Sequence, residues 1–199
     1  PEGGTLVVLA AYPRNTQNIF AGSGGGGVFK SADGGLTWEA ANLGLGNLQI
    51  NALAVDPLDP MVLYAGTYKG PIYKSTNAAL SWAVASAGIQ TEAVTYTLAV
   101  DPKTPGVVYA GTRGISNDGV APWAGVLYKS ADGGASWQAK LQNIGGVSQQ
   151  DWIYSIAINP TASNIVYAAS HEHGPFRSED RGETWYPVSN GITDGSGRA

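Results

Sequence analysis

One eight-residue pattern occurs four times in the 199-residue chain and constrains its fold more than any other feature. The copies, which we call octets, are SADGGLTW (31–38), STNAALSW (75–82), SADGGASW (130–137) and SEDRGETW (178–185). Their first serines are separated by 44, 55 and 48 residues. Because a repeat of this period is typical of solenoids, propellers and arrays, each octet is expected to belong to one structural unit.

Four short apolar segments recur in step with the octet, and each of them reads as a strand. The first ends in proline (LAAYP, LAVDP, LAVDP, IAINP), the second contains small residues (IFAGS, LYAGT, VYAGT, VYAAS), the third runs into the octet (VFKS, IYKS, LYKS, FRS), and the fourth begins at the octet tryptophan. Four strands in a repeat of roughly 45–50 residues predict a propeller blade. A helical solenoid is excluded because no sustained 3.6-residue periodicity is present.

The fold expected is therefore all-β: a β-propeller of four-stranded antiparallel blades. We place the blades at about 5–43, 48–87, 94–142 and 152–190, within one propeller segment, and we expect 191–199 to be a flexible tail. The composition agrees, since 28 glycines, 11 prolines and only 13% charged residues suit short strands joined by tight turns. Four blades leave three alternatives: a fragment of a longer chain, a half-ring completed by a partner or a second copy, or a closed four-bladed ring.

The octet resembles the Asp-box, or BNR repeat, whose pattern is S-x-D-x-G-x-T-W. The copies at 31–38 and 130–137 share the run SADGG, the copy at 178–185 keeps the acid and one of the two glycines, and the copy at 75–82 has lost its acid and glycines. Proteins with this repeat include sialidases, xyloglucan-degrading glycoside hydrolases, the sortilin ectodomain and photosystem II assembly factors. The resemblance implies a propeller, but it does not select a function, because these proteins do unrelated things.

The octet residues are expected to stabilise a hairpin turn rather than to perform chemistry. The acid can accept hydrogen bonds from its own turn, the glycines can adopt positive φ, and the tryptophan can fold over the turn or between blades. A calcium site is a weaker reading, because each turn offers a single carboxylate. The structural set comprises Ser31, Asp33, Gly35, Trp38, Ser75, Asn77, Trp82, Ser130, Asp132, Gly134, Trp137, Ser178, Asp180, Gly182 and Trp185.

Any functional site is expected on the opposite rim, where the loops between second and third strands meet the links between blades. Family members generally bind ligands on that face, and long loops on rigid scaffolds commonly carry function. The loop at 112–125 is the longest. The ligand-binding candidates are Arg113, Asn117, Asp118, Trp123, Asp151, Trp152, His171, Glu172 and His173. The alternative for both tryptophans is that they only seal the seam between blades.

The two histidines of the segment HEH (171–173) would point to one side if the segment were extended, and could then share a metal ion. No third ligand at a fixed spacing is evident, so we expect no metal, and we expect no cofactor. The enzymatic readings are weaker than binding. A sialidase needs an arginine cluster and an Arg-Ile-Pro motif, which is absent. An inverting xyloglucanase needs paired carboxylates, and only Asp118 and Glu172, with Asp151 or Glu92, are available on this rim.

We therefore predict a non-catalytic propeller that binds a protein partner or acts in assembly, with a xyloglucanase-like hydrolase or a carbohydrate-binding fragment as the alternative. A nucleic-acid partner is not expected, because the net charge is −4 and no basic cluster is present. The chain has no cysteine and no apolar run of the roughly 20 residues that span a bilayer. We expect an extracytoplasmic location.

Overall fold

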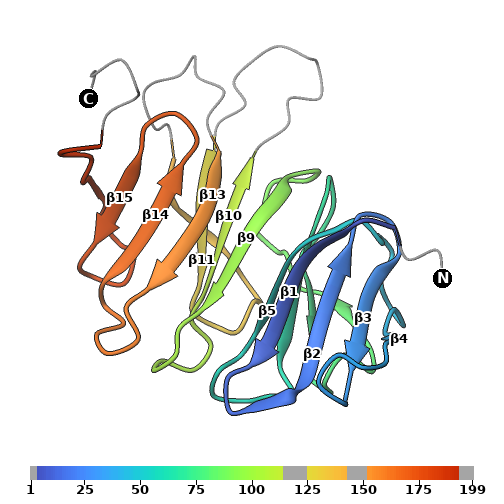
Figure 1. Cartoon of the computed structure of the whole chain (residues 1–199). Helices are drawn as coiled ribbons and strands as arrows, with labels where there is room; N and C mark the ends of the chain where they lie inside the picture. Colours follow the sequence, from blue (N-terminus) through green and yellow to red (C-terminus); the bar gives the residue numbers. More distant parts are fainter. Residues whose placement is uncertain (1–3, 114–124, 143–151, 193–199) are drawn as a thin grey trace.

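The computed structural model describes residues 4–113, 125–142 and 152–192, which form four sheets of four antiparallel strands (Figure 1). Blade 1 contains β1 (Leu6–Tyr12), β2 (Asn15–Ser23), β3 (Gly27–Ser31) and β4 (Glu39–Ala40), and blade 2 contains β5 (Ile50–Val55), β6 (Leu63–Thr67), β7 (Tyr73–Ser75) and β8 (Ala83–Val84). Blade 3 contains β9 (Val94–Val100), β10 (Val108–Arg113), β11 (Gly125–Ser130) and β12 (Gln138–Leu141), and blade 4 contains β13 (Ile153–Ile158), β14 (Val166–Ser170), β15 (Pro175–Ser178) and β16 (Tyr186–Pro187). The predicted all-β propeller of four-stranded blades is confirmed.

Strands follow one another in chain order within each sheet, so consecutive strands of a blade are antiparallel neighbours. The fourth strands differ from expectation, because each begins one residue after its octet tryptophan and three of them have only two residues. In blades 2 and 3, hydrogen bonds to the preceding blade explain why the tryptophan is not part of the fourth strand. The main-chain N–H groups of Trp82 and Trp137 donate to carbonyls of the preceding blade, at 2.8 Å each, and not to their own sheet.

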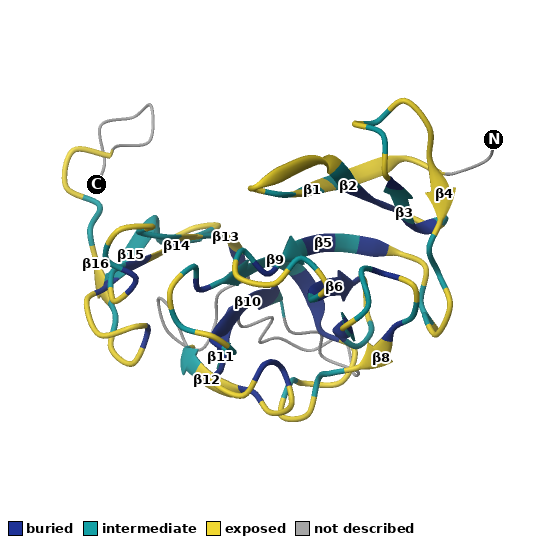
Figure 2. Ribbon diagram, turned by 90° about the horizontal axis from the view of Figure 1, so that it is seen from below, coloured by how far each residue is buried: buried dark blue, intermediate teal, exposed yellow. Residues whose placement is uncertain are grey.

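The blades are arranged along an arc, with the first and last blades at its two ends (Figure 2). The innermost strands pack in sequence, β1 against β5, β5 against β9, and β9 against β13. Apolar clusters fill the seams between blades. Phe20 and Val28 of blade 1 meet Ile50 and Leu63 of blade 2, for example. The middle strand β6 is buried at all five positions because it has a blade on either side.

Each octet forms a compact turn in which the acid binds its own backbone. In the first copy, Asp33 accepts hydrogen bonds from the Thr37 N–H at 2.9 Å, the Thr37 hydroxyl at 2.6 Å and the Ser31 hydroxyl at 2.7 Å. The third and fourth copies repeat this pattern around Asp132 and Asp180. Asn77 takes the same place in the second copy and accepts from the Ser81 N–H at 2.9 Å. Each of these side chains therefore stabilises a bend in its own chain segment.

These hydrogen bonds predict a specific loss of stability in acid. The hydroxyl of Thr37, followed by its N–H group, lowers the pKa of Asp33 to about 2, and Ser136 does the same for Asp132. The pKa of Asp180 is lowered by Thr184. Because the folded-state pKa lies below the unfolded value of about 4, this stabilisation is complete above pH 4 and is lost as the pH falls towards 2.

Denaturant midpoints measured between pH 6 and pH 2 will test this prediction. Replacing all three aspartates by asparagine, the residue that already serves at position 77, should flatten the decline below pH 4 while keeping the turn geometry. A triple variant with the same acid sensitivity as the parent would show that other carboxyl groups control it.

Candidate functional site

The two rims of the arc of blades carry different connections between strands. Strands β3, β7, β11 and β15 run towards the octet rim, whereas β10 and β14 end at the opposite rim, where β9 and β13 begin (Figure 1). We call this opposite rim the loop rim. It carries the connections between second and third strands and the links between blades. Residues near the ends of β10 and β14 and the starts of β9 and β13 are thereby brought together.

A cluster of rings lies on the loop rim across the seam between blades 3 and 4. The indole of Trp152 stacks on the imidazole of His171, with ring centroids 4.1 Å apart and planes at 18°. Tyr154 meets both rings edge to face, at 5.6 Å from each. Tyr96, from β9, lies 5.1 Å from Tyr154 and 6.4 Å from Trp152. We call these four residues, together with Arg113, the aromatic cluster.

Arg113, the fifth member of the aromatic cluster, adds a positive charge to this surface. The guanidinium carbon of Arg113 lies 4.7 Å from the centre of the Trp152 ring, within the range of a cation–π contact. Tyr154 is 45% exposed and His171 is also exposed, whereas Tyr96, Trp152 and Arg113 are half-buried. The cluster thus offers solvent two ring systems supported from beneath by a packed layer, with polar groups at their edges.

Of the predicted site residues, the structure brings Arg113, Trp152 and His171 together. Glu172 is adjacent, with its Oε1 3.8 Å from Nδ1 of His171, and the His173 N–H donates to the Ser170 hydroxyl at 2.9 Å. Asn117, Asp118, Trp123 and Asp151 lie outside the described residues. Residues 171–173 form a bend between β14 and β15, so the extended geometry assumed for a shared metal ion is wrong. Among the described residues, no group of three or more His, Asp and Glu side chains is placed to hold a metal ion.

Sequence reasoning did not single out Tyr96 and Tyr154. Both lie near the start of the innermost strand of a blade, at the third position of β9 and the second of β13. Their location on the loop rim could have been predicted, since an innermost strand begins at the loop rim and its first residues must lie beside the inter-blade link.

A hollow of about 610 Å³ opens on the loop rim between blades 2 and 3. It is lined by the β6–β7 connection, with Lys69, Gly70 and Pro71, and by residues 86–92 of the link to blade 3. The N–H of Gly70 donates to the carbonyl of Ala93 at 3.4 Å, which ties the two walls together. Tyr96 follows the same link on β9, so the hollow and the aromatic cluster belong to one rim.

Comparison with solved structures finds propellers of two functional kinds. The chain is similar to an ancestral GH74 enzyme, with 25% identity over 94% of this chain and a TM-score of 0.78, and to the GH74 xyloglucanase from Xanthomonas campestris, with 23% identity over 97% and a TM-score of 0.71. It is also similar to YCF48 bound to D1 peptide, with 14% identity over 92% and a TM-score of 0.55. It covers 24%, 31% and 68% of those chains respectively, so it spans less than a third of either GH74 protein.

No protein-family model and no curated protein matches the sequence. The two GH74 structures and the YCF48 structure therefore support the propeller fold. None of the described segments forms a helix long and apolar enough to cross a membrane.

Proposed function

We propose that the loop rim binds an extended glycan, with the aromatic cluster as its platform, in a propeller related to the GH74 enzymes. The observation that best supports this proposal is the stacking of Trp152 on His171, with Tyr154 packed edge to face against both rings. One face of a pyranose ring presents weakly positive C–H groups, which are attracted to the negative face of an aromatic ring. The hydroxyl groups of the sugar then meet polar atoms at the cluster's edges.

Electrostatics favour a neutral ligand over a charged polymer. The chain carries a net charge of −4, and the positive charges described on this rim, those of Arg113 and Lys69, are dispersed. A neutral polysaccharide places no charge in contact with the exposed carboxylate of Glu172. Such a ligand would agree with the extracytoplasmic location that we propose for the chain.

Glycan binding predicts that the cluster controls affinity for xyloglucan and cello-oligosaccharides, measured by calorimetric titration. Replacing Tyr154 by alanine should weaken binding by at least roughly tenfold because an exposed ring is lost, and Trp152→Ala should do the same because Trp152 supports the exposed ring of His171. Trp38→Ala is the matched control, since Trp38 is similarly exposed but lies on the octet rim. Equal weakening by all three variants, or no binding by the parent, would contradict the proposal.

Hydrolysis is tested separately from binding. An inverting glycosidase needs an acid and a base about 6.5–9.5 Å apart across the bond. We propose binding without catalysis, so incubation with xyloglucan should release no reducing ends. Release that is abolished by Glu172→Gln or by Asp118→Asn would make the chain a hydrolase and assign a catalytic carboxyl group.

A peptide is the second candidate ligand, because tryptophan, tyrosine and arginine are the residues that most often anchor protein interfaces. The stacking of Arg113 on Trp152 supplies such an anchor. The peptide alternative predicts that no oligosaccharide binds, and that peptides selected from a random library bind the parent but not Trp152→Ala.

A further inference from the structure

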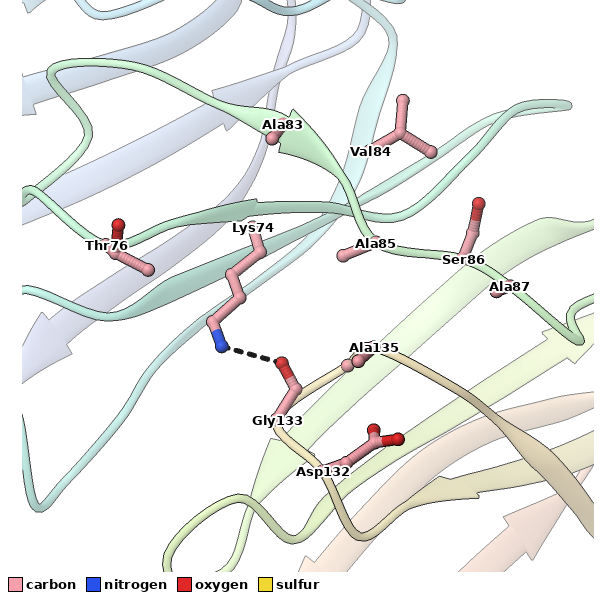
Figure 3. A pocket seen from close by; sticks show the side chains of 11 residues that line it. Lys74, Thr76, Ala83, Val84, Ala85, Ser86, Ala87, Asp132, Gly133 and Ala135 are labelled. Atoms are coloured by element: carbon pink, nitrogen blue, oxygen red, sulfur yellow. Dashed lines mark hydrogen bonds between the residues drawn. The ribbon is translucent and has the colours of Figure 1, made fainter.

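Each seam between blades contains the same directional hydrogen bond. A side chain from the second or third strand donates to the main-chain carbonyl of the fourth octet residue in the next blade. These bonds run from Lys30 Nζ to Ala78 O (3.1 Å), from Tyr64 Oη and Lys74 Nζ to Gly133 O (3.1 and 2.7 Å, the latter in Figure 3), and from Tyr109 Oη to Arg181 O (2.9 Å). The fourth octet residue is thus the point at which one blade holds the next.

The first two seams also contain contacts in the opposite direction. The indole N–H groups of Trp82 and Trp137 donate at 2.8 Å to the carbonyls of Ala41 and Ala85, three residues after the preceding octet. Three residues after each acceptor, a glycine with positive φ lies against the main-chain carbonyl of the tryptophan that donates to that acceptor. These glycines are Gly44 (φ 89°) and Gly88 (φ 94°), and the following residues Leu45 and Ile89 pack into the seam.

Blade 4 carries every one of these seam features on its outer face, where no described blade lies. Tyr167 is 40% exposed, although its equivalent Tyr109 is fully buried. The Val188 N–H donates to the carbonyl of Pro175, as those of Ala41 and Ala85 donate to the carbonyls of Val28 and Ile72. Gly191 has a φ of 84°, and no atom of the described residues lies within 4 Å of the point that a Cβ would occupy. Ile192, the counterpart of Leu45 and Ile89, is 56% exposed.

Hydrogen bonds within blade 4 hold its outer face in the conformation seen at the seams of blades 1 and 2, although no described blade packs there. The Ile192 N–H donates to the Ser189 carbonyl at 2.9 Å, as Leu45 and Ile89 donate to Asn42 and Ser86 at 3.0 Å. Residues 191 and 192 therefore form the same turn as in blades 1 and 2. Arg177, which occupies the position of Lys30 and Lys74, folds back on its own blade, 2.6 Å from Glu179.

Blade 1 presents the complementary features at the other end of the arc. Gly34 is the fourth residue of its octet, the position whose carbonyl is bound in all three seams. The indole of Trp38 is 39% exposed and donates to Gly35 within its own turn at 3.1 Å, as that of Trp185 does to Gly182. Leu9, exposed on β1, adds apolar surface to the same face.

We propose that the outer face of blade 4 docks the octet of blade 1 from a second copy of this chain, head to tail. Tyr167 then donates to the Gly34 carbonyl of the partner copy, and Trp38 of the partner copy donates to the Val188 carbonyl. This docking is favoured because the interface between the two copies would repeat the contacts found at the existing seams. Two copies joined at both ends give eight blades, which lies within the usual range of about four to eight for closed propellers.

Sedimentation of the 199-residue chain over a concentration series tests the association. We expect a dimer, twice the chain mass of 20.5 kDa, in equilibrium with monomer. A chain that stays monomeric at every concentration would overturn the proposal and assign both faces to further blades of one polypeptide.

A mixing experiment tests the head-to-tail geometry. One variant loses the blade 4 face (Tyr167→Ala with Arg177→Ala), and the other loses the blade 1 face (Leu9→Glu with Trp38→Ala). All four side chains lie on the end faces, so circular dichroism should be unchanged. Each variant alone should associate at least roughly tenfold more weakly, whereas their mixture keeps one intact pair of faces and should form a heterodimer. Variants that dimerise normally alone, or a mixture that stays monomeric, would contradict the geometry.

Discussion

Replacing Trp137 by alanine is expected to lower the free energy of unfolding by about 3–5 kcal/mol. Trp137 is 4% exposed and packs with Tyr64, Ile72 and Val108 in the seam between blades 2 and 3. Its indole N–H also donates to the carbonyl of Ala85, which follows β8 of blade 2. Truncation therefore opens a cavity and removes a hydrogen-bond donor in the same place.

The matched control is Trp38→Ala, measured at concentrations where the chain is monomeric. Trp38 holds the same octet position but is 39% exposed and bonds only within its own turn, so its loss should change stability by about 1 kcal/mol or less. Both variants are best followed in guanidinium by far-ultraviolet circular dichroism, because tryptophan fluorescence changes with the substitution itself. Similar losses in both would show that the indole stabilises its own turn and not the seam.

This difference between identical residues marks the limit of what the sequence predicts. The period of the octets and the alternation of the apolar segments determine four-stranded blades, because each unit must bury its faces against a neighbour. The role of Asp33 is likewise predictable, since its partners lie within four residues. Trp82 and Trp137 are buried against the blade before them, whereas Trp185 is only half-buried although blade 3 precedes it. The pattern S-x-D-x-G-x-T-W contains no information about these contacts with the neighbouring blade.

The candidate site shows the same limit at longer range. The sequence places Arg113, Trp152 and His171 on one rim, because strand order determines which ends are shared. It does not place His171 against Trp152, 19 residues earlier, or add Tyr96 from the neighbouring blade. Those contacts depend on the angle between blades 3 and 4 and on the bend at 171–173, neither of which follows from local propensity.

Replacing Gly88 by alanine is expected to lower the free energy of unfolding by about 2–5 kcal/mol, for two separable reasons. Its φ of 94° is strained for any residue with a Cβ atom. The added Cβ would also lie 2.3 Å from the main-chain oxygen of Trp137, which is held in the seam and cannot turn aside. Thermal and guanidinium unfolding would both report the loss.

Gly191→Ala separates the two causes, because Gly191 has nearly the same φ, 84°, but no atom from the described part of the chain lies within 4 Å of the added carbon. It should show only the backbone strain, about 1–2 kcal/mol. The difference between the two variants then measures how tightly blade 3 is held against blade 2. If both glycines tolerate alanine equally, the seam is able to open, and the close approach of Gly88 to Trp137 does not determine the spacing of the blades. In the docked dimer the same Gly191→Ala change would bring a Cβ against the Trp38 carbonyl of the second copy, so it should weaken association while leaving the monomer folded.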